Sequence, residues 1–343
     1  RGDLVVYVSE FTRNIRQAAR AQLLSRAGGI ALVGVALTAI VNLVLLRVVT
    51  RPIGRLVNTV RRIGGGELGV APRRSTTTEL DDLALEIGAM SRSLAKADEY
   101  RRHQMAKAQR IQQHLMPRAD YLQSIGIHHV HLPADDVGGD FFDVKIINDH
   151  RVAIYMGDVT GHGVPAAMSA GMLKTLFEQG EGEIANPAAV LQQINRRFHA
   201  VTLDGDFATM FMGVIDRREG RLIYASAGHE IGYVLRRDGG INELNTTGLL
   251  LGVDPDAECE MAEHIIDPGD TIVLLTDGLI ETMSPKGKPL GRRAVVETMV
   301  INECSSLQQE SPHDLAARLL RLADDHRGGG PQLDDITLAI LRV

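Results

Sequence analysis

Near the start of the chain, the pattern of hydrophobic positions is dominated by one uncharged run. Residues 27–46 carry no charge and lie between Arg26 and Arg47. At about 1.5 Å per residue, a helix of this length crosses the ~30 Å hydrocarbon core of a bilayer. We therefore predict a transmembrane helix over 27–47. A signal peptide fits less well, because a long polar segment precedes the run and no small-residue cleavage pattern follows it.

The segment before this run, residues 1–26, has its own pattern. Residues 4–8 form a short apolar, β-prone run that predicts a strand, and apolar side chains from Phe11 to Leu23 lie on one face of a helix that runs into the span. We interpret 1–26 as the C-terminal tail of an extracytoplasmic sensor region.

After the span, apolar residues recur at steps of three and four, which is the pattern of a coiled-coil seam. They are Ile53, Leu56, Val60 and Ile63, then Leu80, Leu83, Ile87, Met90 and Leu94. Pro52 suits the first turn of a new helix, and the glycines 64–66 end that helix. Two short helices joined by a connector directly after a membrane span resemble a HAMP domain, here over 48–100. The resemblance implies a parallel four-helix coiled coil and therefore a homodimer.

The seam continues through Met105, Ala108, Ile111 and Leu115 until Pro117 ends the helix. The irregular step between Ala108 and Ile111 is a stutter, which changes the local winding of a coiled coil. We interpret 101–118 as a coiled-coil linker that carries a signal, and we hypothesise that it has two registers.

From residue 119 to the end, short strands alternate with amphipathic helices. Residues 222–225 and 231–235 predict a hairpin around Gly228, His229 and Glu230, and residues 237–240 predict a turn. Many hairpins with few helices favour an α+β sandwich over a parallel doubly wound sheet.

Composition narrows the choice of function. The hydrophobic content of 44% and charged content of 23% are ordinary for a globular chain. The net charge of −6 and the 4% of aromatic residues argue against nucleic-acid binding, which favours a basic surface and stacking rings.

Aspartates recur in four short motifs of this C-terminal part. They are Gly138-Gly139-Asp140-Phe141-Phe142-Asp143, Gly157-Asp158-Val159-Thr160-Gly161-His162-Gly163, Thr276-Asp277-Gly278 and Asp334-Asp335-Ile336-Thr337. Three of the four lie beside apolar, β-prone runs. Carboxylates that converge from strand ends repel one another unless a cation lies between them. Hard oxygen ligands suit Mg²⁺ or Mn²⁺, so the motifs predict a metal-dependent enzyme.

The order and spacing of these motifs, together with Ala227-Gly228-His229, resemble the PPM-type (phosphatase-2C superfamily) serine/threonine protein phosphatases, in particular the SpoIIE/RsbU branch. The helix at 108–117, with the sequence AQRIQQHLMP, is also typical of that branch. The resemblance covers 108–343 and implies an αββα sandwich phosphatase domain over 119–343. It further implies two Mn²⁺ or Mg²⁺ ions at one edge, between two sheets.

Motif by motif, the resemblance assigns roles to five residues. Asp158 would bridge the two ions, with the Val159 carbonyl adding to one of them, and Asp277 and Asp334 would complete the other. Asp140 would hold a metal-bound water. Two cations about 3.5–4 Å apart can activate a water and hold the phosphoryl oxygens, which agrees with this assignment.

Other motif residues have more than one interpretation. Asp143 either caps a turn or holds a metal-bound water, and Asp335 either supports the ligands or is a solvated neighbour of Asp334. His162 is either a general acid or a loop residue, since relatives outside this branch have their histidine at the position of Thr160. We expect His229 to be structural or to contact substrate, and Gly161 to permit a tight turn.

We expect a phosphatase bound to the inner (plasma) membrane, with its C-terminal domain in the cytoplasm. Its substrate would be a phosphoprotein, and in this branch the partner is often a STAS-type anti-sigma-factor antagonist. No arginine matches the phosphate-binding arginine of the eukaryotic relatives. The alternative is a pseudophosphatase that binds its partner without chemistry. A nucleotide cyclase is disfavoured, because the sequence has no P-loop-like glycine loop.

Overall fold

The computed structural model describes residues 12–74, 77–179, 184–203, 205–300 and 310–343. The strand predicted at 4–8 lies outside these residues. The chain divides into two compact units, one up to Arg102 and the other His103–Val343.

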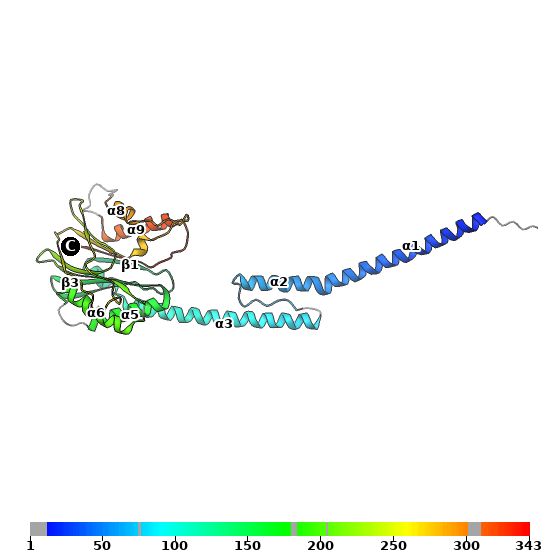
Figure 1. Ribbon diagram of the computed structural model, residues 1–343, viewed down its shortest axis with the longest axis horizontal. Coiled ribbons are helices and arrows are strands. Elements are labelled where there is room, and N and C mark those ends of the chain that lie inside the picture. Colours follow the sequence, from blue (N-terminus) through cyan, green and yellow to red (C-terminus); the bar gives the residue numbers. More distant parts are fainter. Residues whose placement is uncertain (1–11, 75–76, 180–183, 204, 301–309) are drawn as a thin grey trace, which may run out of the picture. The chain divides into compact units, whose positions relative to one another are not determined.

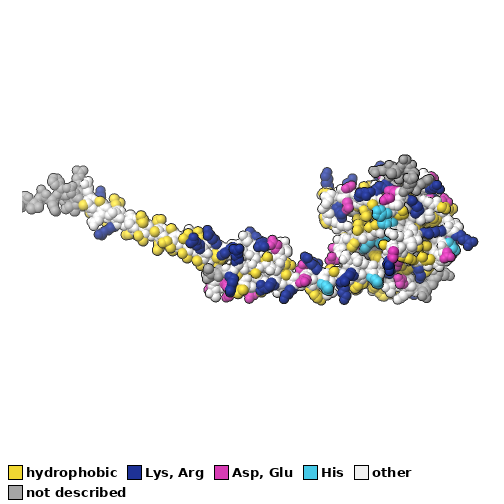
Figure 2. Space-filling view, turned by 180° about the vertical axis from the view of Figure 1, so that it is seen from behind, with side chains coloured by type: hydrophobic (Ala, Val, Ile, Leu, Met, Phe, Trp, Pro, Cys, Tyr) yellow, Lys and Arg dark blue, Asp and Glu magenta, His cyan; other side chains and the backbone are white. Residues whose placement is uncertain are grey.

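The first unit begins with a long helix that is built from consecutive segments. They are α1 (Thr12–Leu45), a π-helical turn (Leu46–Thr50) and α2 (Arg51–Gly64). Within the part of the chain that the structure describes, one helix, Arg16–Gly64, is long and apolar enough to cross a membrane. Hydrophobic side chains surround α1, and arginine side chains gather where it passes into α2 (Figure 2).

Pro52 lies in the first turn of α2, as predicted, although α1 runs into α2 without a break. Proline lacks an N–H and its ring clashes with the carbonyl four residues earlier. The π-helical turn directly before Pro52 widens the helix at this point, and the N–H of Arg51 reaches back to the carbonyl of Leu46. A local change of winding thus precedes the first turn of α2.

The second long helix, α3 (Thr78–Leu115), is continuous and ends just before Pro117, as predicted. The connector before it packs on one of its faces, where the N–H of Gly69 bonds to the carbonyl of Ser91 at 3.3 Å and Ala84 is buried. Another set of seam residues remains exposed in the single chain: Ile53, Val60, Leu83, Met90 and Leu94.

The second unit contains two five-stranded sheets in which every pairing is antiparallel. The β10 sheet has the order β1 (Ile127–Leu132), β10 (Ile336–Arg342), β9 (Thr271–Leu275), β6 (Gly232–Leu235) and β7 (Ile241–Leu244). The β3 sheet has the order β2 (Phe141–Asn148), β3 (Arg151–Val159), β4 (Ala208–Asp216), β5 (Arg221–Ala227) and β8 (Ala262–Ile265).

Helices cover the outer face of each sheet (Figure 1). α5 (Gly163–Gln179) and α6 (Pro187–Val201) pack on the β3 sheet, and α8 (Arg292–Val300) and α9 (Pro312–Arg327) pack on the β10 sheet. The described residues of this unit also form the short helices α4 (Ala119–Ser124) and α7 (Asp277–Ile280). The domain is therefore the α+β, αββα sandwich that the motif resemblance implied.

Strand β3 illustrates why its sequence is apolar almost throughout. Ile154 and Met156 face the β10 sheet, where they join Ile272 and Leu274, whereas Tyr155 points to the helices and packs against Phe177. Because both faces of the sheet are buried, alternation between polar and apolar residues disappears.

The hairpin predicted around Gly228, His229 and Glu230 is wrong. β5 pairs with β4 and β8, whereas β6 lies in the other sheet. Strand alternation does not specify the partner strand, so neighbouring strands in sequence looked like a hairpin. The residues between them instead cross from one sheet to the other. The turn predicted at 237–240 is confirmed, since it joins β6 to β7 and the N–H of Arg236 bonds to the carbonyl of Gly240 at 2.7 Å.

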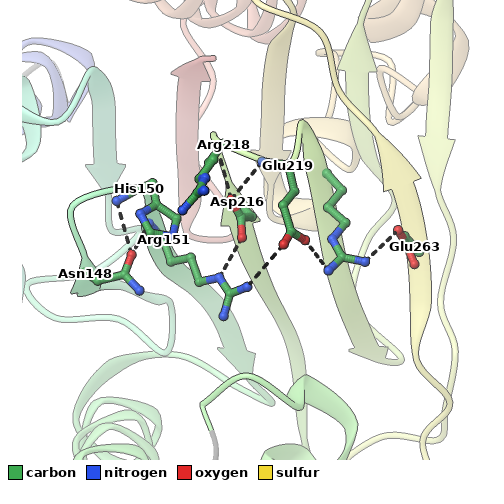
Figure 3. Close-up of polar contacts among 8 residues, drawn as sticks. Asn148, His150, Arg151, Asp216, Arg218, Glu219 and Glu263 are labelled. Atoms are coloured by element: carbon green, nitrogen blue, oxygen red, sulfur yellow. Dashed lines mark hydrogen bonds and ion pairs between the residues drawn. The ribbon is translucent and has the colours of Figure 1, made fainter.

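A row of ion pairs ties together the end of the β3 sheet at which β3 begins (Figure 3). Arg151 Nε lies 2.6 Å from Asp216 Oδ2, and its Nη2 lies 3.9 Å from Glu219. Arg221 pairs with both Glu219 and Glu263, which extends the row to β8. These charges link two hairpin turns and an edge strand at the end of the sheet away from Asp158.

Candidate active site

The four aspartate motifs meet at one end of the sandwich, and each sheet contributes two of them. Asp140 directly precedes β2 and Asp158 lies near the end of β3, while Asp277 follows β9 and Asp334 precedes β10. Phe141 pairs with Gly157, so the same register carried one residue further places Asp140 opposite Asp158. The fold thus brings together carboxylates that are almost two hundred residues apart in sequence.

These carboxylates are close enough to affect one another's protonation. Asp158 lies within hydrogen-bonding reach of both Asp140 and Asp277. Burial, and then the charges of Asp277 and Asp334, raise the pKa of Asp158 to about 8. Burial and Asp334 raise the pKa of Asp277 to about 6, and burial also raises the pKa values of Asp140 and Asp334. Without a cation, the cluster holds protons that isolated aspartates would lose.

Two threonines fix the carboxylate of Asp140. The hydroxyls of Thr276 and Thr337 donate to Asp140 Oδ2 at 2.7 and 2.6 Å. Since Thr337 has one hydroxyl hydrogen, its contact with His131 Nδ1 at 2.9 Å is one in which the ring N–H donates. The buried side of Asp140 is therefore fully tied to the β10 sheet.

Asp335 is buried and is not a solvated neighbour of Asp334. Its Oδ1 accepts the N–H of Ala134 at 2.7 Å, and its Oδ2 accepts the N–H groups of Gly139 at 2.6 Å and Asp140 at 3.4 Å. It therefore anchors the backbone that carries Asp140.

Glycine is required where these segments touch. A Cβ atom on Gly138 would lie 2.0 Å from Asp335 Oδ2, and one on Gly278 would lie 2.0 Å from the Asp335 carbonyl oxygen. A Cβ atom on Gly139 would lie 2.6 Å from the Val159 carbonyl oxygen. Gly161 has a φ of 91°, so it supplies the turn that we expected of it.

Asp143 lies apart from this cluster. Its Oδ2 forms a part-buried ion pair with Lys174 of α5, and its Oδ1 accepts the N–H of Val144 at 2.8 Å. Neither of the roles expected from the sequence matches this position, because successive residues of β2 face opposite sides and Asp143 points to the helices.

The loop after β3 carries the remaining polar groups of its motif. His162 Nδ1 lies 2.6 Å from Asp135 Oδ2, and this contact raises the pKa of the exposed imidazole. Burial raises the pKa of Asp334, and the charge of His162 opposes this shift. The hydroxyl of Thr160 instead donates to the backbone carbonyl of Phe207.

A pocket of about 260 Å³ opens beside Asp158 and Asp277. His229 is buried in its wall, its Nδ1 lies 2.7 Å from the hydroxyl of Thr209, and burial lowers its pKa to about 3. Burial therefore favours the neutral form of the ring. The other lining residues are Gly228, Glu230, Ile231, Asn245, Thr246 and Arg292.

Within the described ranges, no three histidine, cysteine or acidic side chains already stand in the arrangement of a metal site. The donor chemistry nevertheless fits a hard divalent cation, because the coupled groups are carboxylates and repel one another when ionised. Asp158, Asp277 and Asp334 are the side chains that could hold such an ion. The Val159 carbonyl is a backbone oxygen next to Asp158 that could join them.

Comparison with known proteins then decides the family. Residues 148–343 match the family model of stage II sporulation protein E (SpoIIE). The chain belongs to the SpoIIE family. Residues 44–96 match the HAMP domain model. The SpoIIE family comprises PP2C-type protein serine/threonine phosphatases.

Individual relatives agree with this assignment. The chain is 32% identical over 244 residues to protein IcfG of Synechocystis sp., a match that covers 63% of this chain and 38% of IcfG. It is 30% identical over 224 residues to phosphoserine phosphatase RsbU of Bacillus subtilis, covering 64% of each. The matches therefore span less than two thirds of either relative.

Solved structures show the same fold. The SiaA-PP2C domain of Pseudomonas aeruginosa has a TM-score of 0.65 at 24% identity, covering 74% of this chain and all (100%) of that domain. The PP2C domain with a regulatory fragment of Bacillus subtilis SpoIIE has a TM-score of 0.54 at 18% identity, covering 64% of this chain and 63% of that one.

Several polar residues of the SpoIIE-family site were missed in the sequence. Thr276 and Thr337 lie inside the aspartate motifs. Their hydroxyls, next to aspartates at strand ends, could have indicated that they bond to a carboxylate of the site. Gln112, Lys174 and Arg292 lie outside the aspartate motifs, and their contacts with Gly138, Asp143 and Glu230 depend on the tertiary fold.

Proposed function

We propose that this protein is a membrane-anchored phosphatase that uses divalent cations to hydrolyse phosphoserine or phosphothreonine on a partner protein. One observation carries the proposal: carboxylates from both sheets of a SpoIIE-family domain meet at one end with strongly raised pKa values. A fold that only scaffolds a partner gains nothing from this repulsion.

The residues would divide the work as follows. Asp158, Asp277 and Asp334, with the Val159 carbonyl, would hold two Mn²⁺ or Mg²⁺ ions, and Asp140 would orient the attacking water from its place between Thr276 and Thr337. Such ions, when bound, supply the charge that activates water and polarises the phosphoryl oxygens. In the reaction, the water oxygen bonds to phosphorus as the bond to the serine oxygen breaks, and that oxygen takes up a proton.

The partner is best described by its chemistry. RsbU and RsbP of Bacillus subtilis are phosphoserine phosphatases by name, which supports a phosphoserine-bearing protein as substrate. An anti-sigma-factor antagonist of the STAS type is the partner class that the motif resemblance suggests.

A membrane anchor and a dimer complete the proposal. The apolar helix and the HAMP match support anchoring in the inner (plasma) membrane, with the phosphatase domain in the cytoplasm. The exposed seam residues on α2 and α3 support pairing with a second copy, since apolar seams of this kind are buried in coiled coils.

Helix α3 supplies a physical route for gating. Its last turns carry Gln112, whose Nε2 donates to the Gly138 carbonyl at 2.6 Å and whose Oε1 accepts the Gly138 N–H at 3.1 Å. Gly138 is two residues from Asp140 and packs on Asp335. A shift of this helix would therefore move the backbone that carries Asp140.

The test is an assay of the full chain in detergent with Mn²⁺, using p-nitrophenyl phosphate and a phosphoserine peptide. We expect hydrolysis that a chelator abolishes and that Asp158→Asn removes while circular dichroism stays unchanged. Asp256→Asn, an exposed aspartate, is the matched control and should retain activity. Partner binding without hydrolysis under any metal would favour the pseudophosphatase instead.

A further inference from the structure

The pocket beside the carboxylates contains one basic side chain. Asp158 and Asp277 line it, and Arg292, the first residue of α8, is the one lysine or arginine among its described lining residues. A pocket lined by acids alone would repel a phosphate monoester, which carries up to two negative charges. Among the described lining residues, Arg292 is therefore the side chain that can attract a phosphate monoester.

Arg292 is held in place by Glu230, which lies 62 residues away in sequence. Its Nε and Nη2 donate to Glu230 Oε1 at 3.0 and 2.7 Å, and the same oxygen accepts the N–H of Ile231 at 2.9 Å. The Glu230 side chain is only 13% exposed, whereas that of Arg292 is 48% exposed. Glu230 is thus fixed in the pocket wall, whereas the guanidinium of Arg292 faces the open pocket.

The guanidinium keeps donors for another ligand. It has five N–H groups in a planar fork, and Nη1 makes no hydrogen bond to any described residue. A fork of this kind matches two oxygens of a phosphoryl group. The neighbouring Arg293 differs, because its side chain is 91% exposed, pairs with Glu297 one turn along α8 and does not line the pocket.

We infer that Arg292 binds the phosphoryl oxygens of the substrate in this pocket, and that Glu230 positions its guanidinium. The inference rests on the proposed phosphatase function. It supplies the phosphate-binding arginine that no motif in the sequence revealed.

Arg292→Gln in the full chain, in detergent with Mn²⁺, tests the inference. We expect KM for p-nitrophenyl phosphate and for a phosphoserine peptide to rise about 10- to 100-fold, the loss typical of charged hydrogen bonds, and the Ki of inorganic phosphate to rise in parallel. Arg292→Lys should recover part of the loss, since it keeps the charge but not the fork. Arg293→Gln is the matched control and should behave as the wild type.

The positioning role of Glu230 is tested by asking whether the effects of the two substitutions on KM add up in a double variant. Glu230→Gln should raise KM less than Arg292→Gln does, and the double variant should be no worse than Arg292→Gln alone. Additive losses would contradict the positioning role. A rise in KM for the peptide alone, with p-nitrophenyl phosphate and inorganic phosphate unaffected, would mean that Arg292 contacts a flanking residue of the substrate, and the inference would be wrong.

Calorimetric titration of inorganic phosphate into the Mg²⁺-loaded chain separates this inference from the proposed function. If the wild type is inactive with every metal but binds phosphate, and Arg292→Gln does not, the function fails and the role of Arg292 stands. If the wild type is active and Arg292→Gln matches it in KM and phosphate binding, the role of Arg292 fails and the function stands. A wild type that neither turns over substrate nor binds phosphate overturns both.

Discussion

At the residue scale, the clustered aspartates oppose folding when no cation is present. The raised pKa values, about 8 for Asp158 and about 6 for Asp277, exceed the value of about 4 for an aspartate in an unfolded chain. The folded state therefore binds more protons than the unfolded state over this range. Stability of the metal-free protein must then fall as the pH rises from about 4 to about 8.

The fall in stability with rising pH leads to a prediction for Asp158→Asn. Removing the charge should raise the melting temperature of the metal-free chain at pH 8, and the gain should shrink towards pH 5, where the wild-type group is protonated. Thermal unfolding in a chelator across this range measures the effect, with Asp256→Asn as the control. A variant less stable than the wild type at pH 8 would show that the carboxylate is not repelled in the folded state.

Thr337 lies behind the cluster, and its hydroxyl joins Asp140 to His131. Thr337→Val keeps the shape of the side chain but removes this hydrogen bond. We expect Mn²⁺-dependent activity to fall about 10- to 100-fold, as for other groups that orient metal ligands. Thr337→Ser restores the hydroxyl and should recover most of the activity, and equal losses in both variants would contradict the role of the hydroxyl.

The aspartate motifs could be found from sequence because three of the four lie beside apolar, β-prone runs. Their supports could not, because a hydroxyl next to an aspartate has many possible partners until both sheets are in place. Asp335 illustrates the limit: two adjacent aspartates look alike in sequence, yet one is half-buried at the cluster and the other is buried under three backbone N–H groups.

At the scale of elements, the end of α3 is the connection that matters most for the site. Gln112→Ala removes both hydrogen bonds to Gly138 and should lower kcat about 10- to 100-fold, by loosening the backbone next to Asp140. Gln113→Ala changes an exposed neighbour on the same helix and serves as control. If the two variants have equal rates, α3 does not act on the site through Gln112.

The ion-pair row of the β3 sheet stabilises the opposite end of the domain. The hydrogen bond from Arg151 lowers the pKa of Asp216 to about 2. The stabilisation is therefore present above the unfolded value of about 4 and is lost as the pH falls towards about 2. Urea unfolding should find Asp216→Asn less stable than the wild type at pH 7, with a gap that narrows below pH 4. Glu263→Gln, at the exposed end of the row, should change little, and a gap independent of pH would refute the linkage.

The ends of helices and strands could be predicted from the sequence where the backbone chemistry of a single residue decides them. Helix α3 ends before Pro117 and the β6–β7 turn falls at its glycines, because proline and glycine act on their own backbone. The hairpin prediction failed because packing between distant segments decides which strands pair. β5 pairs with β4 and β8 of its own sheet, whereas β6 lies in the other sheet.

At the scale of the whole molecule, one chain carries a helix long and apolar enough to cross a membrane, a HAMP unit and a SpoIIE-family sandwich. Sequence order alone indicated this arrangement, since each part has its own periodicity. The central claim concerns the sandwich: aspartates from two sheets form one site for divalent cations.

Calorimetric titration of Mn²⁺ into the full chain at pH 7, in detergent, tests that claim most directly. The account predicts saturable binding that releases protons, because a carboxyl with a pKa of about 8 must lose its proton to bind the ion. Asp158→Asn and Asp277→Asn should each weaken binding at least about tenfold, and Asp256→Asn should not. Absence of Mn²⁺ binding by the wild type, or equal affinity in Asp158→Asn, would contradict the account.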